Sequence, residues 1–80
     1  MQLGDGVVVA SRFGRHWLLA RHRGRAALVT THADPQSCRV AKQLAHAHGH
    51  RRLDWIVLLD PVASEEMGCW TLMAEHVQAP

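Results

Sequence analysis

The five residues from Trp55 to Leu59, WIVLL, constrain the fold of this chain more than any other segment. All five side chains are apolar, so the segment lacks the alternation that marks a strand with one face in water. Apolar residues at every position are typical of a parallel strand that is buried on both faces. Because parallel strands need crossover connections, the segment predicts an α/β domain in which it is the central, most buried strand.

The residues before this segment predict three more strands. A β-hairpin is expected over residues 6–20, with its turn at Phe13-Gly14-Arg15 between two mainly apolar segments. The polar residues 21–24, which include a glycine, are expected to form a second turn. Residues 25–31 then form the third strand, so the sequence places three strands before the first helix.

A helix is predicted after the third strand. Asp34 is suited to the N-cap, and Pro35 to the first helical position, where its missing N–H leaves no bond unmade. Gly49 lies where a left-handed residue commonly ends a helix. One face of this helix is expected to comprise Val40, Ala41, Leu44, Ala45 and His48. Together with the strands on either side, the helix forms a right-handed βαβ crossover.

A second helix is predicted after the apolar strand. It is expected to begin near Ser64, with Glu65 and Glu66 in its first turn, where negative charge is favourable. Its inward stripe is expected to comprise Met67, Trp70, Met73, Ala74 and Val77. The predicted order is therefore β-β-β-α-β-α, in one α/β domain over residues 1–80 or in a fragment of a larger domain.

The cysteines and the hydropathy pattern exclude several classes of protein. Cys38 and Cys69 are too few and too far apart for a disulfide framework or a zinc knuckle, so we expect reduced, buried thiols. No apolar run approaches the ~18 residues of a membrane span, and the N-terminus lacks the pattern of a signal peptide. The chain as it stands is therefore expected to be soluble.

Basic and acidic residues are distributed unevenly. The residues before Leu53 have a formal charge of +7 and the remainder −5, within a net charge of +2. Such an asymmetry favours a nucleic-acid face or attraction between the two halves. Trp17 is a candidate for stacking on bases, unless it is buried and the arginines are only solvated. The candidate DNA-binding residues are Arg12, Arg15, Arg21, Arg23 and Arg25.

A candidate site lies where the third and fourth strands end. Because parallel strands have their carboxyl ends at the same edge of a sheet, His32 and Asp34 are expected beside Asp60. Asp34 is equally well explained as the N-cap of the first helix, and Asp60 as a turn residue before a proline. The candidate metal ligands are His32, Asp34, Asp60, Glu65 and Glu66. We expect no catalytic residue among them, and no metal or other cofactor.

Three histidines near the end of the first helix resemble a metal motif. On a helix, residues two apart point about 200° away from each other, so His46 and His48 cannot share an ion. Chelation that includes His50 would require the helix end to unwind. We therefore expect solvated histidines at this position.

Three segments of the chain are similar to one known domain. Gln2–Val9 is similar to an opening of the form VGQGDAxLI, and Gly24–Thr31 to a strand of the form G-x-x-LLID. The closest match is Leu44–Gly49 with Arg52–Leu58, which is similar to a helix ending in L-x-x-x-G and a strand beginning LDxLVL. The chain thus resembles the start of the metallo-β-lactamase-like domain of ComEC-type DNA-internalisation competence proteins. This resemblance implies part of a metallo-β-lactamase-like sheet with helices packed on it.

The similarity ends at the metal motif of that family. There the family has His-x-(His/Asp)-x-Asp-His, which binds zinc or a similar ion. At those positions this chain has Asp60, Val62, Ser64 and Glu65, or Glu66 with one insertion. Zinc needs several converging nitrogen, sulfur or carboxylate ligands, which Val62 and Ser64 cannot supply. The resemblance therefore implies a non-catalytic module of a competence protein involved in DNA uptake.

Two other functions stay open at this point. One is a metal-dependent hydrolase or nuclease fragment, and the other is a stand-alone α/β interaction domain. By resemblance, the chain would be a domain of a bacterial inner-membrane protein. Its expected partners are DNA and the remainder of that membrane-associated competence protein. A fragment of a larger sheet would also expose strand edges, which predicts self-association.

Overall fold

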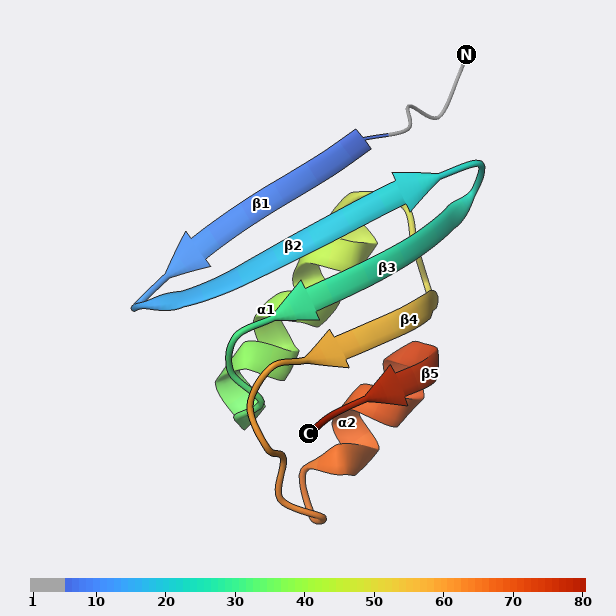
Figure 1. Cartoon of the computed structure of the whole chain (residues 1–80). Coiled ribbons are helices and arrows are strands. Elements are labelled where there is room, and N and C mark those ends of the chain that lie inside the picture. Colours follow the sequence, from blue (N-terminus) through green and yellow to red (C-terminus); the bar gives the residue numbers. More distant parts are fainter. Residues whose placement is uncertain (1–5) are drawn as a thin grey trace.

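A computed structural model describes residues 6–80, which form a five-stranded mixed sheet and two helices (Figure 1). Part of the segment Gln2–Val9 therefore lies outside the described residues. The predicted order of elements is confirmed as far as the second helix, and a fifth strand follows it. The elements are β1 (Gly6–Arg12), β2 (Arg15–His22), β3 (Arg25–Thr30), α1 (Pro35–Ala47), β4 (Leu53–Leu58), α2 (Met67–Met73) and β5 (Ala74–Gln78).

The strands lie side by side in the order in which they occur in the chain. β1, β2 and β3 pair antiparallel, whereas β3, β4 and β5 pair parallel. The parallel pairing of β3 with β4 confirms the predicted crossover through α1. Figure 1 shows both helices on the same side of the sheet. Among residues 6–80, no element covers the other side, and neither helix is long and apolar enough to cross a membrane.

Two tight turns connect the antiparallel strands. Phe13 and Gly14 have φ angles of 54° and 75°, and Arg23 and Gly24 have 51° and 79°. Two consecutive residues with positive φ define a type I′ turn, whose twist matches that of the flanking strands. Glycine at the second position adopts this conformation without strain. The turns predicted around Gly14 and Gly24 are thus confirmed.

Both ends of α1 follow the sequence prediction. Asp34 is the N-cap, because its Oδ1 accepts a hydrogen bond of 2.8 Å from the Ser37 N–H, and a proline opens the helix. At the other end Gly49 has a φ of 85°. The Gly49 N–H donates to His46 O and the His50 N–H to Ala45 O, which is the Schellman arrangement.

The second helix differs from the prediction. Residues 64–66 form a turn and α2 begins at Met67, so Ser64 is not its N-cap. The predicted stripe extends too far, because Ala74 and Val77 belong to β5 and not to the helix. Backbone pairing explains the change: β5 bonds to the free edge of β4, which would otherwise expose unpaired N–H and C=O groups. Trp70 and Met73 are buried, as predicted.

The hydrophobic core lies between the sheet and the two helices. Within β4, Ile56 and Leu58 are buried there, but Trp55 is 44% exposed and Val57 is half-buried on the uncovered side. The prediction that this strand is central and buried on both faces is therefore wrong, because β3 is the middle strand of the sheet and no second layer of helices exists among residues 6–80. The largest fully buried side chains include Trp17, Trp70, Leu19, Leu28, Leu53, Ile56 and Leu58.

A disulfide bond joins α1 to α2. Cys38 and Cys69 are bonded, and the expectation of reduced thiols is therefore wrong for this structure. Their separation of 31 residues in sequence gave no signal of the pairing. Only the packing of both helices on one side of the sheet brings the two side chains together. The bond closes a loop that contains β4, so it restrains the relative positions of both crossovers.

We expect Ile56→Asp to destabilise the fold far more than Val57→Asp. An aspartate at position 56 would lie unpaired in the core, which costs several kcal/mol or forces protonation. At position 57 the carboxylate would reach solvent on the uncovered side of the monomer, so unfolding is measured at a concentration too low for self-association. Urea unfolding followed by circular dichroism measures both free energies of unfolding. Equal losses in the two variants would contradict the assignment of the two faces of β4.

We expect reduction of Cys38–Cys69 to lower the free energy of unfolding by about 3 kcal/mol. Opening a loop of this length returns conformational freedom mainly to the unfolded chain. Urea denaturation with and without a reductant measures the change. A Cys38→Ser/Cys69→Ser double variant is the control, because its stability should not respond to the reductant. A wild-type protein that is equally stable in both conditions would show that the bond contributes nothing.

Candidate functional site

The carboxyl ends of β3 and β4 meet at one edge of the sheet, as the sequence predicted. Thr30 pairs with Leu58, and the Leu59 N–H donates a 3.0 Å hydrogen bond to Thr30 O. The loops that leave these strands contain His32 and Asp34 on one side and Asp60 on the other. The candidate residues of both loops therefore lie at the same edge of the sheet.

Both carboxylate oxygens of Asp34 form hydrogen bonds within the structure. Besides capping α1, its carboxylate forms an ion pair with Arg15, whose Nε donates to Oδ2 at 2.8 Å and whose Nη2 also contacts that oxygen. The hydrogen bond from Arg15 holds the pKa of Asp34 below its ordinary value, although partial burial opposes the shift. The Ser37 N–H stabilises the same charged form. Asp34 thus ties the β1–β2 turn to the start of α1.

The interior beneath this edge is filled by two tryptophans and their hydrogen-bond partners. The Trp17 indole N–H lies 3.0 Å from Ser37 Oγ and 3.1 Å from Ser37 O. Ser37 Oγ in turn lies 3.1 Å from Thr30 Oγ1, and the Trp70 indole N–H donates to Ala33 O at 3.3 Å. These buried groups satisfy one another, as buried polar groups must. They stabilise the fold, and each of these groups is already hydrogen-bonded within it.

The other candidate ligands do not converge. His32 Nδ1 lies 2.9 Å from Thr31 Oγ1, and Asp60 and Glu65 are exposed. Glu66 is half-buried in the turn before α2. Within residues 6–80, no three His, Cys, Asp or Glu side chains are grouped so that they could hold a metal ion. The carboxyl edge therefore offers capping and turn residues, and no built site.

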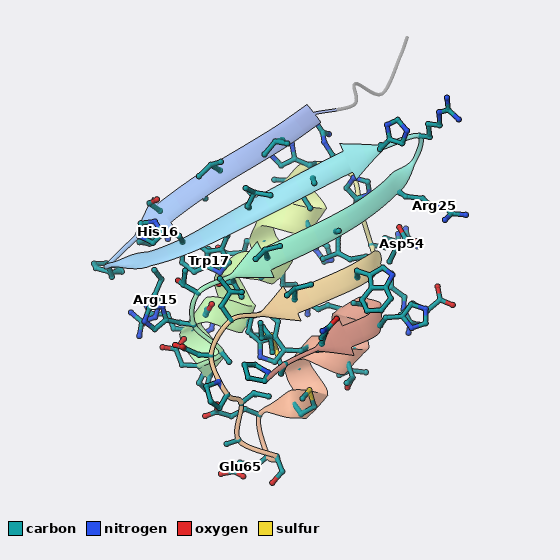
Figure 2. The ribbon with its side chains drawn as sticks, in the orientation of Figure 1. Arg15, His16, Trp17, Arg25, Asp54 and Glu65 are labelled. Atoms are coloured by element: carbon teal, nitrogen blue, oxygen red, sulfur yellow. A yellow bond between two sulfur atoms is a disulfide. The ribbon has the colours of Figure 1, made fainter. Side chains whose placement is uncertain are left out.

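The five candidate arginines do not form one patch. Arg12 and Arg15 flank the β1–β2 turn, whereas Arg21, Arg23 and Arg25 surround the β2–β3 turn. Because β2 has eight residues, the two turns are roughly 23 Å apart. Figure 2 shows Arg15 and Arg25 at opposite ends of the sheet. Only the second group lies away from Asp60, Glu65 and Glu66.

Trp17 cannot stack on a base. Its side chain is 1% exposed and its indole N–H is hydrogen-bonded inside the core. The alternative stated from the sequence, a buried Trp17, is thus confirmed. Two other aromatic side chains do reach the surface. Phe13 is 76% exposed in the β1–β2 turn, and Trp55 is 44% exposed and stacks on His76 of β5 with ring centroids 4.7 Å apart.

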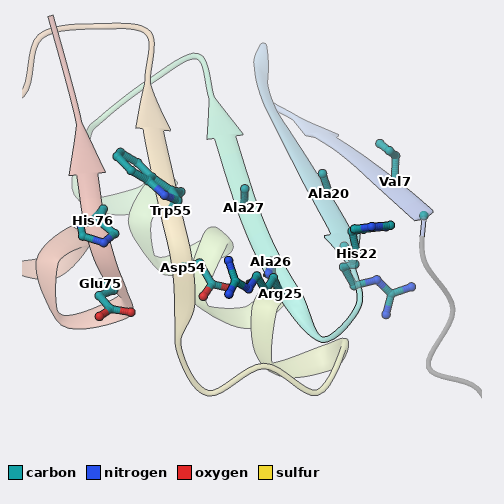
Figure 3. A pocket seen from close by; sticks show the side chains of 12 residues that line it. Val7, Ala20, His22, Arg25, Ala26, Ala27, Asp54, Trp55, Glu75 and His76 are labelled. Atoms are coloured by element: carbon teal, nitrogen blue, oxygen red, sulfur yellow. Dashed lines mark hydrogen bonds between the residues drawn. The ribbon is translucent and has the colours of Figure 1, made fainter.

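Trp55 and His76 border a shallow cavity of about 640 Å³ on the uncovered side of the sheet (Figure 3). Its floor is formed by the small side chains of Ala20 and Ala27. The sequence did not indicate this cavity. Trp55 lies within a run that is apolar throughout, and His76 was placed in a helix. The cavity exists because no helix covers this side of the sheet among residues 6–80 and because β5 places His76 beside Trp55.

Charged side chains of both signs lie at one end of this cavity. Arg25 and His22 come from the β2–β3 turn, while Asp54 and Glu75 come from the starts of β4 and β5 (Figure 3). Asp54 also accepts a 2.8 Å hydrogen bond from the Ala26 N–H. The cavity is therefore apolar in its middle, basic at one corner and acidic at the next.

Comparisons with known proteins give no relatives for this chain. No protein-family model, no curated protein and no solved structure matches it. The fold that the structure establishes is an α/β fold with a five-stranded mixed sheet and two helices.

We expect Asp34→Asn to destabilise the protein at neutral pH but not in acid. The pKa of Asp34 is lower in the folded chain than in the unfolded chain, so its contribution is present above the unfolded pKa. That contribution is lost as the pH falls through the folded pKa. Asparagine still caps the helix, and the ion pair is partly exposed, so the loss at pH 7 should be about 0.5 kcal/mol.

Urea unfolding at pH 7 and at about pH 2.5 measures this difference. The exposed Asp60→Asn substitution is the matched control and should leave stability unchanged at both values. A loss in Asp34→Asn that persisted in acid would show that the charge of Asp34 is not what stabilises the fold.

Proposed function

We propose that this chain is a non-catalytic module with a metallo-β-lactamase-like framework, of the kind found in ComEC-type competence proteins, and that it contacts DNA. Support for the framework comes from the two segments of closest resemblance. Leu44–Gly49 lies at the end of α1, and Leu53–Leu58 is β4, so each lies in the kind of element that the resemblance requires. On this proposal, the remainder of a membrane-associated competence protein is a further partner.

The lack of catalysis is supported by the edge where β3 and β4 end. Of the candidate ligands, Asp34 is held by Arg15 and by the helix it caps. The positions that correspond to metal ligands in the family include Val62 and Ser64, which cannot complete a zinc site. The same edge thus retains its structural residues but has few groups left for chemistry.

The observation that carries the DNA contact is the group of basic residues at the β2–β3 turn. Arg21, Arg23 and Arg25 lie within five residues, and the latter two are exposed. Arginine side chains neutralise phosphates, and the release of counterions then drives association. The turn projects from the sheet at the end opposite the Asp60 loop, so the acidic residues of that loop do not oppose the contact.

The experiment is a salt titration of binding to fluorescent single- and double-stranded DNA. We expect wild-type binding to weaken steeply with salt, each phosphate contact adding a slope of about 0.7 on a log–log plot for single strands. Replacing Arg21, Arg23 and Arg25 by serine should abolish most of this binding. Trp17 is left unchanged, because it is buried and contributes no stacking.

A charge-matched variant is the control for net charge. Arg12, Arg39 and Arg51 are exposed and lie outside the β2–β3 turn, so changing these three to serine removes the same charge elsewhere. We expect this control to retain most of the binding. Equal loss in the two triple variants would mean that net charge alone attracts DNA, and no binding by wild type at low salt would refute the proposed contact.

A further inference from the structure

The uncovered side of the sheet, which we call the open face, is apolar from β1 to β4, and β5 adds His76 and Gln78 at its edge. Two rows of residues cross it in register: Val9, Leu18, Val29 and Val57 in one, and Val7, Ala20, Ala27 and Trp55 in the other. Val7 is 61% exposed and Val9 65%. An antiparallel sheet with one face in water normally places polar residues there. This face instead has the composition of a surface that packs against another layer.

We infer that the open face binds the open face of a second copy of this chain, sheet against sheet, around a two-fold axis that runs parallel to the strands between β3 and β4. This proposal is independent of DNA contact. Face-to-face sheets pack about 10 Å apart with their strands nearly aligned, which such an axis allows. In a two-fold dimer the same patch is used twice, so it must be complementary to itself.

The shape of the open face meets this requirement. Its bulkiest side chains are the stacked pair of Trp55 and His76, and beside them the small side chains of Ala20 and Ala27 line the cavity. The proposed axis places β4 of one copy over β3 of the other, and β5 over β2. Trp55 then lies opposite the partner's Ala27 and His76 opposite the partner's Ala20. Each aromatic pair thus fills the other copy's cavity.

The charges at the rim meet the same requirement. Arg25 begins β3 and Asp54 lies near the start of β4, so the two-fold rotation brings opposite charges together across the interface. His22 at the end of β2 likewise lies opposite the partner's Glu75. In the dimer, the basic corner of each cavity therefore faces the acidic corner of the partner's cavity. An apolar centre with a charged rim is the usual anatomy of a specific interface.

The area is that of a weak dimer. The proposed axis overlays β2 to β5 of the two copies and leaves β1 outside, so four strands at a spacing of ~4.8 Å, each about six residues long, give a face of roughly 19 by 20 Å. Two such flat faces bury on the order of 800 Å², to which the side-chain relief adds, so the interface lies at the low end of the range for specific protein contacts. Within the described part of the chain, residues 6–80, the helix side offers no comparable surface, because most of its apolar residues already form the core.

Sedimentation velocity of the 80-residue chain over a range of concentrations tests the proposal. We expect a closed dimer in the wild type and a dissociation constant raised at least ~100-fold by Trp55→Glu, which would bury an unpaired charge in the partner's cavity. Leu72→Glu is the matched control, because Leu72 is 82% exposed on α2, the opposite side of the molecule. It should dimerise like the wild type.

A charge exchange tests the axis even if Trp55→Glu folds poorly. Arg25→Glu places a negative charge opposite the partner's Asp54 and should weaken the dimer, and adding Asp54→Arg should restore it. Circular dichroism confirms that each variant is folded. A wild type that stays monomeric at tens of micromolar, an open-ended series of larger assemblies, or a Trp55→Glu variant that dimerises normally would each overturn the proposal.

Discussion

The packing of both helices on the same side of the sheet is the constraint on which the rest of this structure depends. It concentrates the large side chains, Trp17 and Trp70 among them, into one core and brings Cys38 within bonding distance of Cys69. It also leaves the other side of β1 to β5 without cover among residues 6–80. The stability of the fold and its open face therefore have the same origin, because a single helical layer can bury only one face of a sheet.

Many α/β proteins place their functional residues where the parallel strands end. At the edge where β3 and β4 end, the residues of this chain have structural roles instead. Asp34 caps α1 and pairs with Arg15, and the polar atoms beneath it satisfy one another. A carboxylate committed in this way holds the β1–β2 turn in place and is not available as a ligand. The proposed function accordingly lies at the opposite end of the strands, at the β2–β3 turn.

The two proposals are compatible in space. A two-fold axis parallel to the strands keeps both β2–β3 turns at the same end of the dimer, so the turn arginines of the two copies would lie near each other. Two linked basic groups bind a continuous polyanion more strongly than one, since the second contact is then intramolecular. Arg25 would belong to both surfaces, as a rim residue beside the partner's Asp54 and as the edge of the basic turn.

By itself, the sequence determined the local structure. Gly14 and Gly24 marked the turns, Asp34 and Gly49 marked the ends of α1, and these signals are visible because they act over a few neighbouring residues. The fully apolar run at Trp55 could not reveal that one of its faces is open, since apolar residues on both sides of a strand do not say what covers them. Only the tertiary structure decided that residues 74–78 pair with β4, that Cys38 meets Cys69 and that Trp55 stays exposed. Each of these depends on contacts between residues far apart in the chain, and a local pattern contains no information about them.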